Sequence, residues 1–219
     1  FIWTGFLIMY SIFDGNIDSI RNFFREDNGI GWQYLISMAV ITFAMAGNPL
    51  LTTPISRAGK SLFAEKYLPI DLENQLKGKM IVNLEVLGAI IFVYGVLVYY
   101  LSLNVILSIF VVLTSFLLIV ALSFRGLEVD LAAPNLYWEN EQELRKGNFS
   151  GVGMMFLFEL LTGGAVLVGY ILSLFTELSL IYGVILFLIV YGAMIYYQKK
   201  NFYKYSIKRF REILEEESH

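Results

Sequence analysis

The segment VILSIFVVLTSFLLIVALSF, residues 105–124, determines the class of protein to which this chain belongs. It has no charged residue, and about 20 apolar residues are what an α-helix needs to cross the hydrocarbon core of a membrane. Backbone N–H and C=O groups in lipid must be satisfied within the segment, which favours a helix. A strand of a membrane β-barrel would instead be about ten residues long and would alternate polar and apolar residues.

Four other segments have the same character. Of the 219 residues, 57% are hydrophobic and 16% are charged, whereas a typical soluble domain has about 25% charged residues. The five apolar segments contain only two formal charges, Glu85 and Glu159. We therefore predict an all-α, polytopic transmembrane helix bundle of about six spans, the first of them truncated to residues 1–13. The five complete segments are residues 32–51, 80–101, 105–124, 152–174 and 178–197.

The composition argues against catalysis by this chain. It has no cysteine, and its one histidine is His219, so neither a Cys–His nor a Ser–His pair is available. The net charge of −3 provides no overall basic field for nucleic acid. We therefore expect a protein that is not an enzyme, has no catalytic, cofactor-binding or metal-binding residue of its own, and does not bind nucleic acid.

The distribution of lysine and arginine predicts the orientation in the membrane. Of the 16 Lys and Arg residues, only Arg21 and Arg25 lie in the polar connection 14–31. All the others lie in residues 52–79, 125–151 and 199–219. Because cytoplasmic connections carry the excess of Lys and Arg, we predict that these three regions are cytoplasmic in a multi-pass protein of the cell membrane.

Two short connections and the end of the chain complete the predicted organisation. Residues 102–104 and 175–177 leave room only for turns, so each should join an antiparallel helix pair. Residues 1–198 form the predicted transmembrane domain and residues 199–219 a cytoplasmic tail. Since the tail is first basic and aromatic and then acidic, we expect a helix end that contacts anionic lipid and then a solvated helix.

The connection 52–79 contains Gly59-Lys60-Ser61, which is the ending of a nucleotide-binding P-loop. The first glycine of that motif would fall at Pro54, and proline has no backbone N–H and cannot adopt a positive φ. A membrane span, rather than a buried strand, precedes it. We therefore expect no ATP binding here, but a turn and a short interfacial helix between Pro54 and Pro69.

Two loops together resemble those of a known family. SRAGKSLFAEKYLPI, residues 56–70, followed by LKGK at the foot of a span, is similar to a cytoplasmic loop of ABC-type exporter permeases. DLAAPNLYWENEQELRKGN, residues 130–148, resembles the loop after the fourth span in the C-terminal half of such permeases. The resemblance implies a transport subunit whose partner ATPase holds ATP and Mg, with further permease spans or a second permease completing the path.

The same resemblance implies that residues 56–66 form an amphipathic coupling helix that sits in a groove of the ATPase. Ser56 suits the N-cap of such a helix and Lys66 its C-terminal turn, and Leu62 with Phe63 would fill an apolar pocket of the partner. The alternative is an interfacial helix that lies on lipid headgroups without a partner. The residues predicted to couple to the ATPase are Ser56, Arg57, Lys60, Leu62, Phe63, Lys66 and Pro69.

The second of these loops, residues 130–148, is called the acidic loop below. We predict that it forms a second cytoplasmic contact and packs against the coupling loop, residues 52–79, or against the ATPase. Three of its carboxylates recur at every second residue, but they lack the histidine or the glycine-turn loop of a metal site. A solvated helix start, with carboxylates near its N-terminus, is the simpler interpretation. The residues predicted for this contact are Trp138, Glu139, Asn140, Glu141, Gln142 and Glu143.

The two intramembrane carboxylates are candidate functional groups, because ionisable residues within spans are costly. Glu85 lies near the start of its segment, where Lys77 or Lys79 could pair with it. Glu159 lies deeper, and a substrate path, proton carriage or a neutral acid bonded to a neighbouring helix are all open. Two other functions therefore compete with the permease: a proton- or ion-coupled secondary transporter that uses Glu159, and a membrane scaffold without transport. No residue pattern indicates the substrate.

Overall fold

The computed structural model describes residues 17–25, 29–46, 48–140, 143–144, 149–173 and 180–216. Every regular element in this part of the chain is a helix, so the predicted all-α class is confirmed. The elements before the first long span are α2 (Ile17–Arg25), α3 (Ile30–Ala46), α4 (Pro49–Thr52) and η1 (Ser56–Tyr67). The elements that follow are α5 (Leu72–Ser102), α6 (Val105–Ala132), α8 (Phe149–Ser173), α9 (Leu180–Asn201), η2 (Phe202–Ser206) and α10 (Ile207–Glu216).

Three helices in the described part are long and apolar enough to cross a membrane, which indicates a membrane protein. They are α5, α6 and the continuous helical segment Leu180–Glu215. A fourth results if Ile30–Met45 and Pro49–Tyr67, which meet at 59°, are one broken span. In α8 the apolar stretch is shorter, Phe156–Gly169. The predicted count of six is thus not reached in the described residues, and the predicted first span, residues 1–13, lies outside them.

Helices α5 and α6 form the predicted antiparallel hairpin. Leu103 closes α5 in the left-handed conformation with φ 54°, and its N–H donates to the carbonyl of Tyr99 at 2.7 Å. Asn104 then caps α6, because its side chain accepts from the backbone N–H of Leu107 at 3.0 Å. The turn over residues 102–104 is therefore confirmed, whereas the predicted turn at 175–177 lies outside the described residues.

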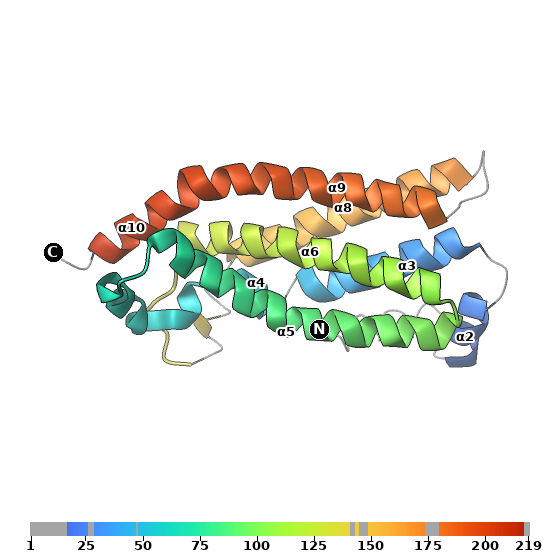
Figure 1. Ribbon diagram of the computed structural model, residues 1–219, viewed down its shortest axis with the longest axis horizontal. Coiled ribbons are helices and arrows are strands. Elements are labelled where there is room, and N and C mark those ends of the chain that lie inside the picture. Colours follow the sequence, from blue (N-terminus) through green and yellow to red (C-terminus); the bar gives the residue numbers. More distant parts are fainter. Residues whose placement is uncertain are drawn as a thin grey trace.

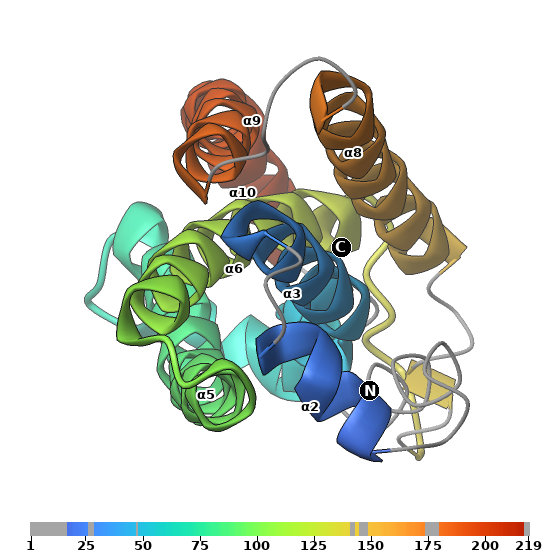
Figure 2. The same cartoon turned by 90° about the vertical axis from the view of Figure 1, so that its right-hand side faces the viewer.

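The bundle core lies between α3 and α6, which Figure 2 shows at the centre with α5, α8 and α9 around them. Large side chains from several helices meet there. Tyr34 of α3 packs edge-on against Phe187 of α9, with ring centroids 5.8 Å apart. Thr42 and Tyr191 share a hydrogen bond of 3.1 Å between the same two helices. This core holds the helices that carry the functional candidates at one end of the bundle.

The polar connections gather at the two ends of the bundle. Helix α2 lies beside the α5–α6 turn, where Arg21 donates to the hydroxyl of Tyr100 at 3.4 Å. The opposite end carries η1, the start of α5, the end of α6 and α10 (Figure 1). The regions 52–79, 125–140 and 199–216 therefore meet at one end, as their shared lysine and arginine content predicts.

Three elements at that end differ from the prediction. Helix α5 begins at Leu72 and α6 continues to Ala132, so each predicted connection contributes about two further turns of helix. Ion pairs within one helix, Lys77–Glu73 and Arg125–Glu128, support these polar turns.

The tail also differs from the prediction, because it does not stand free in solvent. It packs against the bundle through Phe202, Phe210, Ile213 and Leu214, all of which are buried.

Candidate functional site

A second apolar cluster, separate from the bundle core, fills the end of the molecule that carries η1. We call it the end cluster. It joins η1, the first turns of α5, the last turns of α6, η2 and α10 into one packed unit. Its buried members are Ile55, Leu62, Leu76, Met80, Leu127, Leu131, Leu136, Phe202, Phe210, Ile213 and Leu214.

Element η1 is not the continuous amphipathic helix expected for residues 56–66. It consists of 3₁₀ turns interrupted at Gly59, whose φ of 54° and ψ of −141° are non-helical. Only glycine adopts such a backbone without strain. The expected N-cap is also wrong, since Ile55 occupies the cap position and no side chain caps the helix. The glycine of the P-loop-like sequence therefore serves to bend the loop.

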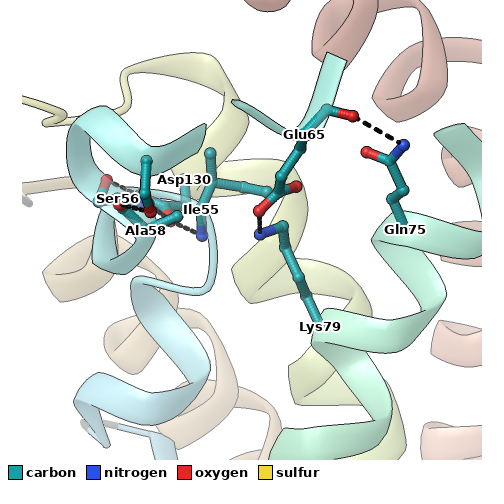
Figure 3. A network of polar contacts seen from close by, with 8 residues as sticks. Ile55, Ser56, Ala58, Glu65, Gln75, Lys79 and Asp130 are labelled. Atoms are coloured by element: carbon teal, nitrogen blue, oxygen red, sulfur yellow. Dashed lines mark hydrogen bonds and ion pairs between the residues drawn. The ribbon is translucent and has the colours of Figure 1, made fainter. Parts of the chain in front are cut away.

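Asp130, near the end of α6, holds the start of η1. One carboxylate oxygen accepts from the backbone N–H groups of Ile55 at 2.6 Å and Ser56 at 2.8 Å, and the other accepts from the Ser56 hydroxyl. Asp130 is only 2% exposed, and both of its partners are buried as well. Three donors compensate this carboxylate for the water it has lost, so the contact is strong and sterically specific. Figure 3 shows it.

The acidic loop closes over the same point from the other side. The indole N–H of Trp138 donates to the carbonyl of Ser56 at 2.7 Å, and the backbone N–H of Asn135 donates to the Ser56 hydroxyl at 2.9 Å. A Cβ atom added at Gly59 would lie 3.4 Å from the Trp138 indole nitrogen. The two loops that carry the family resemblance are therefore bonded to each other through Ser56.

The far end of η1 is fixed to α5. Glu65 and Lys79 form an ion pair of 2.7 Å, in which the side chains are 21% and 16% exposed. Gln75 donates to the carbonyls of Glu65 at 3.3 Å and Ile70 at 2.8 Å. Figure 3 shows the contacts of Glu65 with Lys79 and Gln75 beside the Asp130 network. The start of η1 is therefore bonded to α6 and its far end to α5.

The outer side of η1 is exposed on the surface of the chain. Arg57, Lys60 and Lys66 are exposed, and the Lys60 ammonium lies 5.7 Å from the Tyr137 ring centroid. Exposed apolar residues follow, with Tyr67 84% exposed, and Leu68 and Ile70 about half exposed. Pro69 is exposed too.

Leu62 and Phe63, predicted to anchor in the partner, do not lie on this open side together. Leu62 is fully buried in the end cluster of this chain, and Phe63 is half-buried against that cluster. A buried Leu62 cannot enter a pocket of another protein. The prediction for Leu62 is therefore wrong.

The acidic loop forms a local turn. Asn140 accepts from the backbone N–H of Glu143 at 3.0 Å, and the Glu143 carboxylate accepts from the Glu139 backbone N–H and from the Asn140 amide, both at 3.0 Å. Such reciprocal capping is typical of a helix start. Glu141 and Gln142 lie outside the described residues. Among the residues that the structure describes, no three His, Asp or Glu side chains come together as a metal site.

The predicted partners of Glu85 are engaged elsewhere. Lys79 pairs with Glu65, and Lys77 pairs with Glu73, so the predicted pairing is wrong. Glu85 itself is exposed on α5. Glu159 belongs to α8, but its side chain lies outside the part of the chain that the structure describes.

The residue that the sequence analysis missed is Asp130. The sequence does mark this residue. Asp130 is an acidic residue that follows the apolar segment 105–124, and it is the first residue of the second motif that resembles the permease family. Its partner could not be read from the sequence, since the bonds join positions 74 and 75 residues apart.

No protein-family model, no curated protein and no solved structure matches this chain.

Proposed function

We propose that this chain is a membrane-spanning permease subunit of an ABC-type exporter, and that the outer side of η1 docks a partner ATPase. The observation that carries the proposal is a loop that is exposed on one side and bonded on the other to two long apolar helices. The resemblance of residues 56–70 and 130–148 to the cytoplasmic loops of such permeases supports it. ATP and Mg²⁺ belong to the partner, and this chain contributes motion rather than chemistry.

The bonded contacts define how motion would be transmitted. Closure of the ATPase on ATP would displace η1. The Asp130 network passes that displacement to α6, and the Glu65–Lys79 ion pair passes it to α5. Because packed interiors respond as rigid units, the hairpin of α5 and α6 would tilt as a whole. Further spans, or a second permease, would form the other wall of the translocation path.

The docking surface under this proposal is defined by exposure. Lys60, Lys66, Tyr67, Leu68 and Ile70 all present exposed side chains. Among them Tyr67 is a large aromatic of the kind enriched at the centre of protein interfaces, and the two lysines suit the polar rim around such a centre. The excess of lysine and arginine in these regions supports their cytoplasmic placement, where a soluble ATPase is available.

The experiment is co-purification of the full-length protein with its partner. Wild type should retain a P-loop ATPase, identified by mass spectrometry. The double variant Lys66→Glu, Tyr67→Glu should lose it, because it places two carboxylates at the docking surface without touching the end cluster. Tyr205→Glu is the matched control, since Tyr205 is an exposed tyrosine of η2 at the same end. Retention of the ATPase by the double variant, or its absence from wild type, would refute the proposal.

A further inference from the structure

A groove of about 360 Å³ opens between α5, α6 and the junction of α9 with η2. Its inner part is apolar and is formed by Met80, Leu84, Val120, Phe124 and Phe202. The rings of Phe124 and Phe202 meet edge-on, with centroids 5.7 Å apart, and close its base. A surface of this kind accepts hydrocarbon.

Two lysines stand at the rim of the groove. Lys77 lies just before the apolar segment 80–101, and Lys199 lies just after the apolar segment 178–197. Both therefore occupy the same boundary between the apolar part of the bundle and water. Tyr203 completes the rim, about half exposed, with the Lys77 ammonium 6.0 Å from its ring centroid. Cations and tyrosines at this depth are typical of the headgroup layer of a membrane.

The first two residues of the π-helical turn η2 line the groove. Phe202 is buried against Phe124, whereas its neighbour Tyr203 packs edge-on against Phe202 and is about half exposed. One element thus supplies an apolar wall and a polar rim within two residues.

The acidic side chains nearby leave positive charge at the rim. Glu73 pairs with Lys77, but that lysine side chain remains 45% exposed. Glu128 is engaged by Arg125 at 2.7 Å and by the Asn201 amide at 3.1 Å. Lys199 is exposed, and so are Lys200 and Lys204 beyond it. The rim therefore carries more positive than negative charge.

We propose that this groove binds one anionic phospholipid, with its phosphate at Lys77 and Lys199 and the start of an acyl chain on Phe124, Met80 and Leu84. The charge of the rim selects an anionic over a zwitterionic headgroup. The apolar interior selects a lipid over a free phosphate, which would leave it unfilled. This inference requires only that the bundle is embedded in a membrane, and so it does not depend on the proposed transport function.

The test is native mass spectrometry of the full chain in detergent, titrated with phosphatidylglycerol or phosphatidylcholine of identical acyl chains. Wild type should retain phosphatidylglycerol about tenfold more strongly, the preference expected when one or two cations contact an anionic headgroup. Lys77→Gln with Lys199→Gln should abolish that preference. Lys208→Gln with Arg211→Gln is the matched control, because both residues lie on α10 outside the groove and Lys208 pairs with Glu212 at i,i+4 as Lys77 pairs with Glu73.

A second pair of variants separates a groove from general surface charge. Leu84→Trp fills the interior and keeps both lysines, so phosphatidylglycerol binding should fall at least fivefold. Val93→Trp places the same side chain at an exposed position of α5 outside the groove and should leave binding unchanged. Equal retention of the two lipids by wild type would overturn the inference. So would equal effects of groove and control variants, or displacement of the lipid by equimolar glycerol 3-phosphate.

Discussion

Replacement of Asp130 tests whether one carboxylate fixes η1 to the bundle. In Asp130→Ala, the backbone N–H groups of Ile55 and Ser56 lose their acceptor, and each lies at a residue that is at most 2% exposed. An orphaned buried donor costs about 1–3 kcal/mol. The loss of a desolvated charge offsets part of that cost. We therefore expect η1 to be destabilised locally by about 3 kcal/mol.

Hydrogen exchange of the backbone amides over residues 55–62, read by mass spectrometry in lipid nanodiscs, measures this directly. Since 1.4 kcal/mol is a factor of ten, exchange in Asp130→Ala should be roughly 100-fold faster. Asp130→Asn keeps an oxygen for the two N–H groups and loses only the charge, so its exchange should accelerate by roughly fivefold.

Asp71→Ala is the control for these variants. Asp71 is an exposed carboxylate in the same connection, and it makes no side-chain capping bond to α5. Its replacement should leave exchange over residues 55–62 unchanged. If Asp130→Ala exchanged at the wild-type rate, Asp130 would not hold η1, and the route from η1 to α6 would be refuted.

Three further substitutions probe the same end of the bundle through thermal unfolding and local exchange. Gly126→Ala should destabilise the protein by about 2–3 kcal/mol, because the added Cβ would lie 1.8 Å from the Leu51 carbonyl oxygen, a backbone atom that cannot rotate away. Trp138→Phe removes one hydrogen bond to η1 and should cost about 1 kcal/mol. Lys79→Met leaves the Glu65 carboxylate unpaired and should cost about 1 kcal/mol; adding Glu65→Leu should recover part of it.

These substitutions have internal controls. Gly78→Ala should stabilise α5 by about 0.5–1 kcal/mol, since no atom lies within 4 Å of the added Cβ. If Gly126→Ala behaved like Gly78→Ala, the close approach of α6 to Leu51 would be wrong. An unchanged unfolding temperature in Trp138→Phe would show that the Trp138 hydrogen bond does not stabilise the contact between the acidic loop and η1. Wild-type stability in Lys79→Met would show that the Glu65–Lys79 ion pair does not hold η1 to α5.

The sequence predicts α5 and α6 well because their signal is local. Membrane thickness fixes the length of an apolar segment, so 80–101 and 105–124 mark α5 and α6 without knowledge of their neighbours. The Leu103–Asn104 turn follows from the few residues between them. The polar extensions of both helices were missed, because hydropathy detects only the part of a helix that faces lipid.

The contacts at the end of the bundle could not be predicted because they are not local. Asp130 finds its donors in η1, and Leu62 is buried by residues of α5, α6 and α10. The pattern of residues 56–66 was compatible with an exposed amphipathic helix, yet tertiary packing bends the loop at Gly59 and turns Leu62 inward. For the same reason the charged tail appeared solvated although its apolar residues complete the end cluster.

The central claim, that η1 is the docking element for a partner ATPase, is tested most directly by site-specific photocrosslinking in intact membranes. A photoreactive residue at Tyr67 should crosslink to a protein with a P-loop, whereas the same residue at Tyr100, exposed beside α2 at the opposite end, should not. A crosslink to a P-loop ATPase from position 67 alone is the predicted result. No such product from position 67, or equal yields from both positions, would contradict the account.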